Sequence, residues 1–127
     1  MGEGKTADTV TLFRPTGEKE LALIQGGGWR EFPPRLPEQP NFYPVLNEEY
    51  ATQIARDWNT RDGGVRYVLR FNVEADYLKQ FPIQTAGSRI HHEYWIPAER
   101  LREFNEHIVG LIEVIGEFRA PIAAPVQ

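Results

Sequence analysis

Side chains of the kinds that act as nucleophiles are scarce in this chain. It contains no Cys, and Ser88 is its only serine. A Ser-His-Asp triad would need Ser88 together with one of the three histidines, but Ser88 lacks the Gly-x-Ser-x-Gly turn that exposes such a nucleophile. The absence of Cys excludes a thiol nucleophile, a zinc ribbon and a disulfide framework. The sequence therefore argues against hydrolysis by an activated serine or cysteine.

Three short motifs suggest a binding function, and each has a simpler structural explanation. His91 and His92 precede Glu93, but adjacent strand residues point to opposite faces, so the two imidazoles do not readily meet one ion. We therefore expect no metal site. The three glycines at 26–28 follow a predicted helix and open none, which favours a helix stop over a phosphate loop. The Pro-x-x-Pro spacing at 34–40 could dock an SH3-like domain, but its composition favours a stiff loop bordering a pocket.

Arg14, Tyr43 and Glu93 form a more informative set because of their order and their flanking residues. Arg14 ends a predicted first strand, Tyr43 shortly precedes a predicted helix, and Glu93 starts a hydrophobic strand after a polar loop. This order resembles the ADP-ribosyltransferase superfamily over roughly residues 9–118. The chain also resembles small bacterial proteins labelled "ADP-ribosylation/crystallin J1", a label that carries little mechanism. The resemblance implies an α+β fold with two small sheets packed around a nucleotide cleft and short flanking helices.

The resemblance also implies roles for these residues, with NAD as the substrate. Glu93 would be catalytic, since a carboxylate can accept the ribose 2′-hydroxyl and stabilise positive charge as the nicotinamide–ribose bond breaks. Arg14 would hold the pyrophosphate or a ribose through its guanidinium. Tyr43 would stack on the nicotinamide and exclude water. Each residue taken singly also fits a plain structural role, so the expectation depends on the set.

Further basic residues and a histidine complete the implied site. We expect Arg35 and Arg70, with Arg66, to help bind phosphate, because an acidic protein needs a local positive site for a dinucleotide. His91 stands two residues before Glu93, where arginine-directed transferases carry a second Glu, so it is expected to act in activating the acceptor. The polar loop at 84–90 would face that acceptor.

The family pattern is matched only in part, and this leaves alternatives open. The middle position lacks Ser-Thr-Ser, so Tyr43 fits only the family variants that use an aromatic residue there. His91 replaces the second Glu, which argues against protein arginine as acceptor and leaves another acceptor or simple NAD hydrolysis open. The predicted function is an ADP-ribosyltransferase or NAD glycohydrolase, with a protein acceptor or cognate inhibitor as partner. The main alternative is a non-catalytic domain of the same fold that binds a nucleotide or a protein. A weaker one is an interaction module that uses the proline loop.

Hydrophobic periodicity and the signals for helix ends and turns predict the elements that position these residues. Strands are expected at 10–14, 29–32, 65–73, 92–96 and 111–118, and helices at 18–25, 47–58, 75–81 and 98–108. Pro15 is expected to end the first strand and Gly110 the last helix. Strands and helices mix without strict alternation, which favours the α+β class. The expected core comprises Trp58, Tyr67, Leu69, Phe71, Leu101, Phe104, Ile112 and Val114.

Length and charge limit the remaining possibilities. The 127 residues suit one domain, predicted at 9–118 with loose termini at 1–8 and 119–127. The formal net charge of -4 argues against nucleic acid as a partner. No apolar stretch approaches the roughly 20 residues that a bilayer requires, and the first ten residues do not resemble a signal peptide. These features predict a cytoplasmic protein with no membrane partner.

Overall fold

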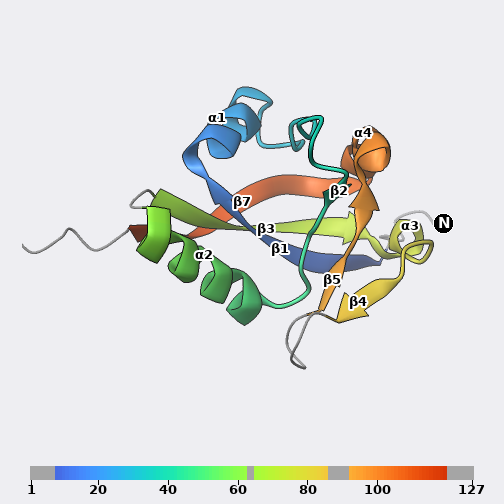
Figure 1. Cartoon of the computed structure of the whole chain (residues 1–127). Coiled ribbons are helices and arrows are strands. Elements are labelled where there is room, and N and C mark those ends of the chain that lie inside the picture. The colour runs from blue at the N-terminus through green and yellow to red at the C-terminus, as the bar shows by residue number, and fades with distance from the viewer. Residues whose placement is uncertain (1–7, 63–64, 86–91, 120–127) are drawn as a thin grey trace, which may run out of the picture.

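Three long antiparallel strands form the centre of the fold in a computed structural model, which describes residues 8–62, 65–85 and 92–119. They are β1 (Thr9–Gly17), β3 (Val65–Glu74) and β7 (Ile108–Arg119), in the spatial order β1-β3-β7. Each pairs with its neighbour in the antiparallel sense. Figure 1 shows the three strands crossing the middle of the molecule, with β3 between the other two. One edge of β1 is therefore left for other partners.

A second group of short strands joins that edge of β1. Residues 41–46 pair antiparallel with residues 92–97, and Val45 pairs with Phe13 on one side and with Glu93 on the other. The Phe13 and Val45 backbones exchange two hydrogen bonds of 2.8 Å. The short strands are β2 (Asn41–Phe42), β4 (Ile83–Thr85), β5 (His92–Tyr94) and β6 (Ile96–Pro97), with β4 paired to β5 and β2 to β6.

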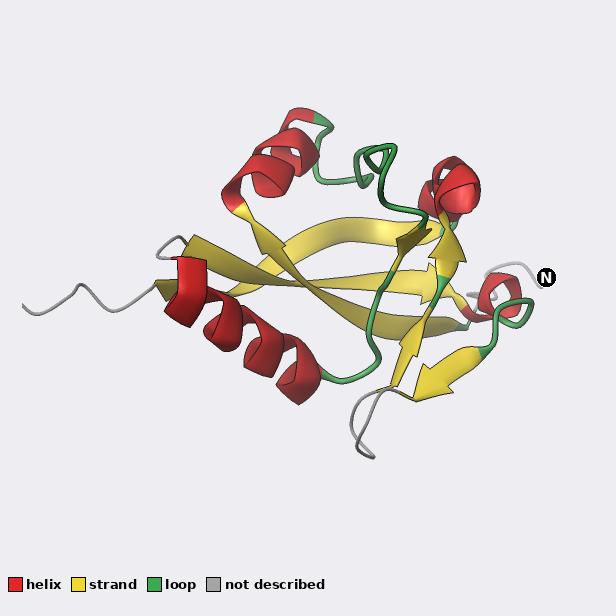
Figure 2. Ribbon diagram, in the orientation of Figure 1, coloured by secondary structure: helices red, strands yellow, loops and turns green. Residues whose placement is uncertain are grey.

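Helices cover both faces of the three-stranded sheet. Figures 1 and 2 show α1 (Glu18–Gly26) and α4 (Leu101–Glu106) on one side and α2 (Glu48–Asp62) on the other. A 3-10 turn (η1, Ala98–Arg100) leads into α4, and the short α3 (Ala75–Leu78) follows β3. Small antiparallel sheets with a few helices agree with the predicted α+β class.

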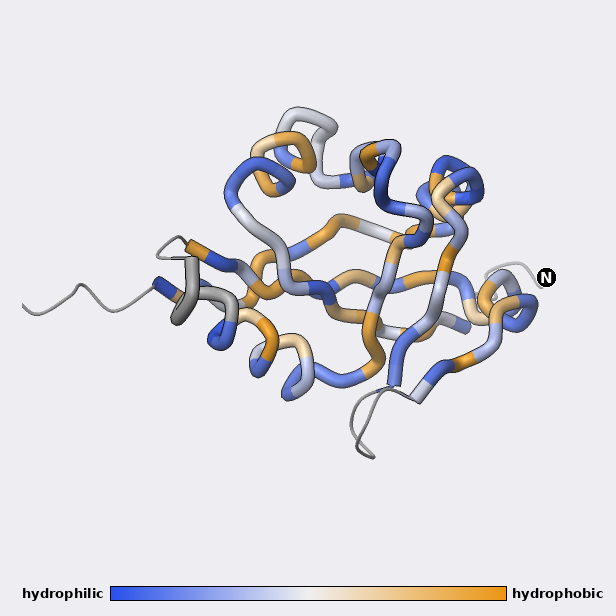
Figure 3. The backbone as a smooth tube through the Cα atoms, viewed as in Figure 1, coloured by the Kyte–Doolittle hydropathy of each residue, from blue (hydrophilic) through white to orange (hydrophobic). Residues whose placement is uncertain are grey.

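Apolar residues pack on both faces of the sheet, and β3 contributes to each. Leu69, Phe71 and Val73 alternate along β3 and join the main core, which includes Ile24 of α1 and Phe104 of α4. On the other face, Val68 joins a smaller core with Val45 and with Ala51 and Ala55 of α2. Figure 3 shows hydrophobic residues concentrated on the central strands, and hydrophilic ones on the outer turns of the helices.

The predicted core is largely confirmed. Leu69, Phe71, Leu101, Phe104 and Ile112 are buried. Tyr67 is only half-buried and packs against the main core. The prediction for Val114 is wrong: this side chain is 42% exposed, because β7 is an outer strand whose register to β3 changes next to it. The side chain of Trp58 lies outside the described residues.

The first strand continues through Pro15, against the prediction that it ends there. The Phe13 N–H points outward to Val45, and because amide directions alternate along a strand, the Pro15 nitrogen also points away from β3. Pro15 therefore removes no hydrogen bond of the β1–β3 ladder. The strand consequently extends to Gly17, which brings Arg14 and Thr16 into its interior.

Three other predicted elements differ in the structure. The last helix ends at Glu106, and Gly110 lies inside β7 with φ +82°, beside a register shift that marks a bulge. Residues 29–32 form no strand, since Trp29 adopts φ +64° after the turn that ends α1. Gln84 belongs to β4 rather than to a loop, and the rest of the predicted loop at 86–90 lies outside the described residues.

The segment after Trp29 is held to α4 by one side-chain amide. Asn105 accepts a hydrogen bond from the Phe32 N–H at 2.9 Å and donates one to the Phe32 carbonyl at 3.0 Å. Phe32 itself is buried against Phe42 and Phe71. The proline loop at 33–40 contains neither helix nor strand, as predicted. Phe32 therefore ties the start of this loop to the core.

We expect Asn105→Ala to lower the free energy of unfolding by about 2 kcal/mol, because both backbone groups of the half-enclosed Phe32 peptide lose their partner. Asn72→Ala is the matched control, since it removes a surface hydrogen bond with Thr11 and should cost about 0.5–1 kcal/mol. Urea unfolding followed by circular dichroism measures both. Equal losses in the two variants would contradict this role for Asn105.

Candidate functional site

A cavity of about 550 Å³ lies along the outer edge of β1. Residues 14–17 of β1 form one wall, and Tyr43 and Val45 form part of the opposite wall. Phe13 and Val45 are hydrogen bonded at one end, so the cavity occupies the space beyond that bridge. We call this cavity the β1 cleft. Its volume is within the range typical of small-molecule sites.

The β1 cleft reaches both faces of the sheet, because successive residues of β1 point to opposite sides. Arg14 pairs with Leu69 and so lies on the side of α1 and the main core. Pro15 pairs with Val68 and so lies on the side of α2. A ligand in this cleft would therefore meet two chemically different surfaces.

On the α1 side, Arg14 makes a two-point ion pair with Glu20. The Arg14 Nε and Nη2 atoms donate to the two Glu20 carboxylate oxygens at 2.6 and 2.8 Å. The Arg14 guanidinium also lies over the Phe42 ring, 4.6 Å from its centroid. The Nη1 group of Arg14 takes no part in the ion pair with Glu20, and it carries two further N–H donors. The ion pair thus fixes the direction of the Arg14 side chain, of which only a tenth is exposed.

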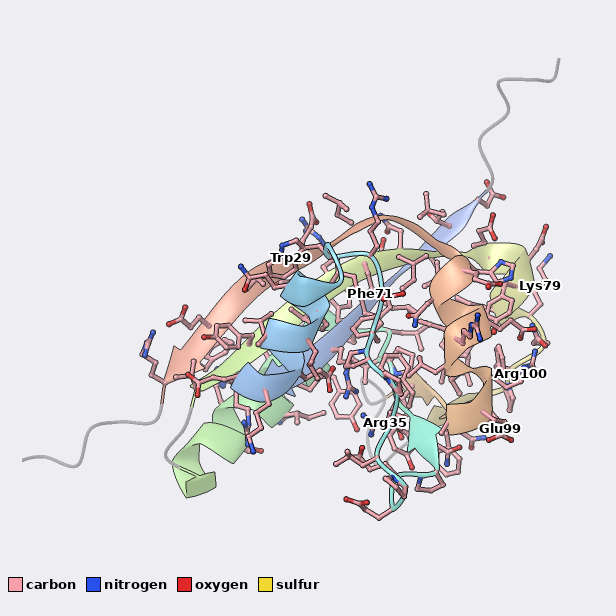
Figure 4. The ribbon with its side chains drawn as sticks, turned by 90° about the horizontal axis from the view of Figure 1, so that it is seen from above. Trp29, Arg35, Phe71, Lys79, Glu99 and Arg100 are labelled. Carbon is pink, nitrogen blue, oxygen red and sulfur yellow. The ribbon has the colours of Figure 1, made fainter. Side chains whose placement is uncertain are left out.

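A second guanidinium shares that carboxylate. Arg35 Nη1 lies 3.9 Å from Glu20, and Arg35 Nε donates to the Asn41 carbonyl at 2.9 Å. Figure 4 shows Arg35 on the loop that passes between α1 and α4, close to β2. Two guanidinium groups therefore converge on one carboxylate, and this side of the cleft has an excess of positive charge.

The titration of these groups reflects that arrangement. Burial alone would raise the pKa of Glu20, but the charge and hydrogen bonds of Arg14, followed by Thr16 and Arg35, hold that pKa below its usual value. Burial and the neighbouring charge of Arg14 lower the pKa of Arg35, which Glu20 and Tyr43 only partly oppose. The Thr16 residue is almost fully buried, and its hydroxyl lies close enough to Glu20 to affect the pKa of that carboxyl. This hydroxyl forms no well-aligned hydrogen bond with any described residue.

On the α2 side, Glu93 is the acidic group of the cleft. Its Oε2 atom accepts a hydrogen bond of 2.9 Å from the Trp95 indole, and its carboxylate also accepts one from the Tyr50 hydroxyl. Val45 and Ile54 provide apolar wall here, and the Arg66 guanidinium lies against Gly17. This surface combines an anchored carboxylate with apolar and cationic neighbours.

The charge of the cleft is opposite in sign to that of the chain. Among the described residues, three arginines and two glutamates line it, and together they carry one net positive charge, whereas the whole chain carries -4. A low-dielectric concave site strengthens such a local field. The cleft is therefore suited to a ligand that carries negative charge at one end and a hydroxyl or a developing positive charge near Glu93.

Five of the seven residues predicted for the site line this one cleft: Arg14, Arg35, Tyr43, Arg66 and Glu93. The structure does not bring Arg70 there. Arg70 is exposed on β3 and pairs with Glu113 of β7. It lies opposite Phe13, at the end of β1 where the Val45 bridge closes the cleft, whereas Arg66 of the same strand lies opposite Gly17 and lines the cleft. His91 lies outside the described residues.

Sequence reasoning missed several residues that shape the cleft. Glu20 looked like an ordinary acidic residue in the first turn of a helix, and Tyr50 looked like part of an amphipathic stripe. Trp95 looked like any strand aromatic. Only the Glu93-x-Trp95 spacing, which places both side chains on one strand face, carried a signal that could have suggested contact.

Several further features of the described residues bear on function. None of their Asp, Glu and His side chains gather into a group of three able to hold a metal ion. No helix within 8–62, 65–85 or 92–119 is both long and apolar enough to cross a bilayer. Comparison of the chain with protein-family models, with curated proteins and with solved structures found no match.

We expect Glu20→Gln to lower the free energy of unfolding at pH 7 by about 3 kcal/mol, because Arg14 would stay buried without its counter-charge. The folded pKa of Glu20 is depressed, so its stabilisation is present above the unfolded value near 4.5 and is lost as pH falls through the folded pKa. The difference between the wild type and the variant should therefore shrink in acid. Urea unfolding at a series of pH values measures it.

Glu113→Gln is the control for this prediction. Its ion pair with Arg70 is about half exposed on both sides, so its loss should cost less than about 1 kcal/mol. A Glu20→Gln loss as small as that of Glu113→Gln, or one that does not change with pH, would contradict the account of the buried pair.

Proposed function

We propose that this protein binds NAD in the β1 cleft and breaks its nicotinamide–ribose bond, as an ADP-ribosyltransferase or an NAD glycohydrolase. One observation carries the proposal. Arg14, Tyr43 and Glu93, which come from three distant parts of the sequence, lie on neighbouring extended segments and line the same cavity. Their order along the chain resembles that of the ADP-ribosyltransferase superfamily, so sequence order and spatial proximity support the same reading.

The reaction needs a site that tolerates positive charge on a sugar. The C–N bond between ribose C1′ and nicotinamide breaks, and its electron pair goes to the nicotinamide nitrogen, which becomes neutral. The ribose is left with oxocarbenium character, as in glycoside cleavage. Water or another nucleophile then adds to C1′ and loses a proton. In this proposal Glu93 accepts the ribose 2′-hydroxyl and stabilises the positive charge from a fixed position.

The opposite end of the cleft suits the pyrophosphate. Arg14 and Arg35 converge on the single Glu20 carboxylate, so an anion that enters beside them meets uncompensated positive charge. The fixed guanidinium of Arg14 keeps its Nη1 donors for such a ligand, and forked contacts of this kind are strong for phosphates. Tyr43, on the wall between the two ends, would contact the nicotinamide.

The architecture is compatible with the superfamily fold that we propose. The β1 cleft lies where the ribbon of residues 41–46 and 92–97 departs from the three-stranded sheet. Figure 1 shows α1 and α2 on the two sides of this part of the sheet. In this reading β1 carries the first motif residue, the segment after β2 the second, and β5 the third. The histidine in place of a second Glu favours NAD hydrolysis or an acceptor other than protein arginine.

We expect Glu93→Gln to reduce nicotinamide release from NAD by about 100-fold or more, because the variant keeps the size of the side chain and loses its charge. Its thermal stability should stay close to that of the wild type. Glu113→Gln, which alters an exposed strand carboxylate outside the cleft, should retain full turnover. Release is measured by chromatography at saturating NAD.

The two arms of this experiment separate enzyme from binding domain. Full turnover by Glu93→Gln would overturn the assigned role of Glu93. A wild-type protein that binds NAD without releasing nicotinamide would overturn the catalytic proposal and leave the nucleotide-binding alternative.

We expect Arg35→Gln to weaken ADP-ribose binding by about tenfold, because one of the two guanidinium groups at the phosphate end is removed. Arg35 serves better here than Arg14, whose loss would deprive the part-buried Glu20 of its two hydrogen bonds. Arg70→Gln is the matched control, since Arg70 lies outside the cleft and should bind ADP-ribose as the wild type does. Titration calorimetry measures the three proteins, and equal affinities would remove Arg35 from the site.

A further inference from the structure

The Glu93 carboxylate is held by two aromatic side chains from different elements. Trp95 lies two residues further along the same strand segment, on the same face, and its Nε1–H donates to Glu93 Oε2 at 2.9 Å. Tyr50, in the first turn of α2, donates its hydroxyl to the same carboxylate. A carboxylate offers about four acceptor sites, so two donors leave room for a ligand hydroxyl.

Trp95 is itself fixed by the opposite strand. Its ring meets Tyr43 edge to face, with centroids 6.0 Å apart and planes at 89°. This is the geometry that the charge distribution of aromatic rings favours. Trp95 therefore joins the aromatic wall of the cleft to its carboxylate, although 44% of its surface is exposed.

Tyr50 is fixed from the other direction. Asn47 lies three residues before Tyr50 and caps the start of α2: its side-chain Oδ1 accepts a hydrogen bond of 3.1 Å from the Tyr50 backbone N–H. Burial, followed by the charge and hydrogen bond of Glu93, raises the pKa of the Tyr50 hydroxyl, which keeps it protonated as a donor at neutral pH. The two donors approach Glu93 from a strand neighbour and from a helix, and this limits rotation of the carboxylate.

We infer that Trp95 and Tyr50 are positioning residues that hold the Glu93 carboxylate in the orientation needed to meet the ligand's ribose. This inference rests on the proposed function. A charge stabiliser acts best when it is already oriented, because no reorganisation is then needed as positive charge develops. Trp95 and Tyr50 do not contact the reacting atoms in this scheme, and their effect passes through Glu93.

The test removes each donor and keeps an aromatic ring at its position. Trp95→Phe and Tyr50→Phe should each lower kcat for nicotinamide release by about tenfold and leave KM nearly unchanged, because a transition-state contact is loosened and ground-state binding is not. Trp29→Phe is the matched control, since Trp29 lies outside the β1 cleft and should keep wild-type kcat.

A double variant separates positioning from a general loss of structure. In the Glu93→Gln background, Trp95→Phe should cause little further loss of kcat, because the charged group that it orients is already gone. A structural role would instead lower kcat by the same factor in both backgrounds. In ¹H–¹⁵N spectra, Glu93→Gln should shift the indole N–H signal of Trp95 and leave that of Trp29 in place.

The outcomes distinguish this inference from the proposed function. The positioning role would be overturned if Trp95→Phe and Tyr50→Phe kept the wild-type kcat, or if Glu93→Gln did not shift the indole N–H signal of Trp95. Neither result would contradict NAD cleavage by the wild type. Absence of nicotinamide release by the wild type would overturn the proposed function and the positioning role with it.

Discussion

The backbone pairing of Val45 with both Phe13 and Glu93 is the constraint on which the candidate site depends. This residue lies between β1 and the strand that carries Glu93, so one short extended segment links the three-stranded sheet to the outer ribbon. Beyond the bridge the two walls separate and leave the β1 cleft. If this pairing shifted by one residue, every side chain of the segment would change face, and Tyr43 would leave the cleft.

A second constraint is electrostatic. Arg14 is buried in the wall of the cleft, and burial of a guanidinium is costly unless it is paired and hydrogen bonded. Glu20 meets both needs, but Arg35 shares the same carboxylate, so the pairing leaves an excess of positive charge. Structure alone gains little from a second buried cation. An anionic ligand would supply the missing counter-charge, and this is why we propose phosphate as the ligand group at this end of the cleft.

Sequence predicted what is determined locally and missed what depends on tertiary partners. Helix α2 can be predicted from Asn47, a residue type that favours helix starts, and from the apolar residues at helical spacing that include Ala51 and Ala55. In the structure Asn47 caps α2, and Ala51 and Ala55 are buried in the smaller core. Pro15 was misjudged because its effect depends on which way its nitrogen faces, and only the position of Val45 decides that. Arg35 and Arg70 look alike in sequence, yet one enters the cleft and the other pairs with Glu113 on another strand.

A crystal structure of the Glu93→Gln variant with NAD bound would test the central claim most directly. We expect the nicotinamide ribose next to residue 93, the nicotinamide ring against Tyr43, and the pyrophosphate beside Arg14 and Arg35. NAD bound in the opposite direction, or outside the cleft between β1 and residues 43–45, would contradict it.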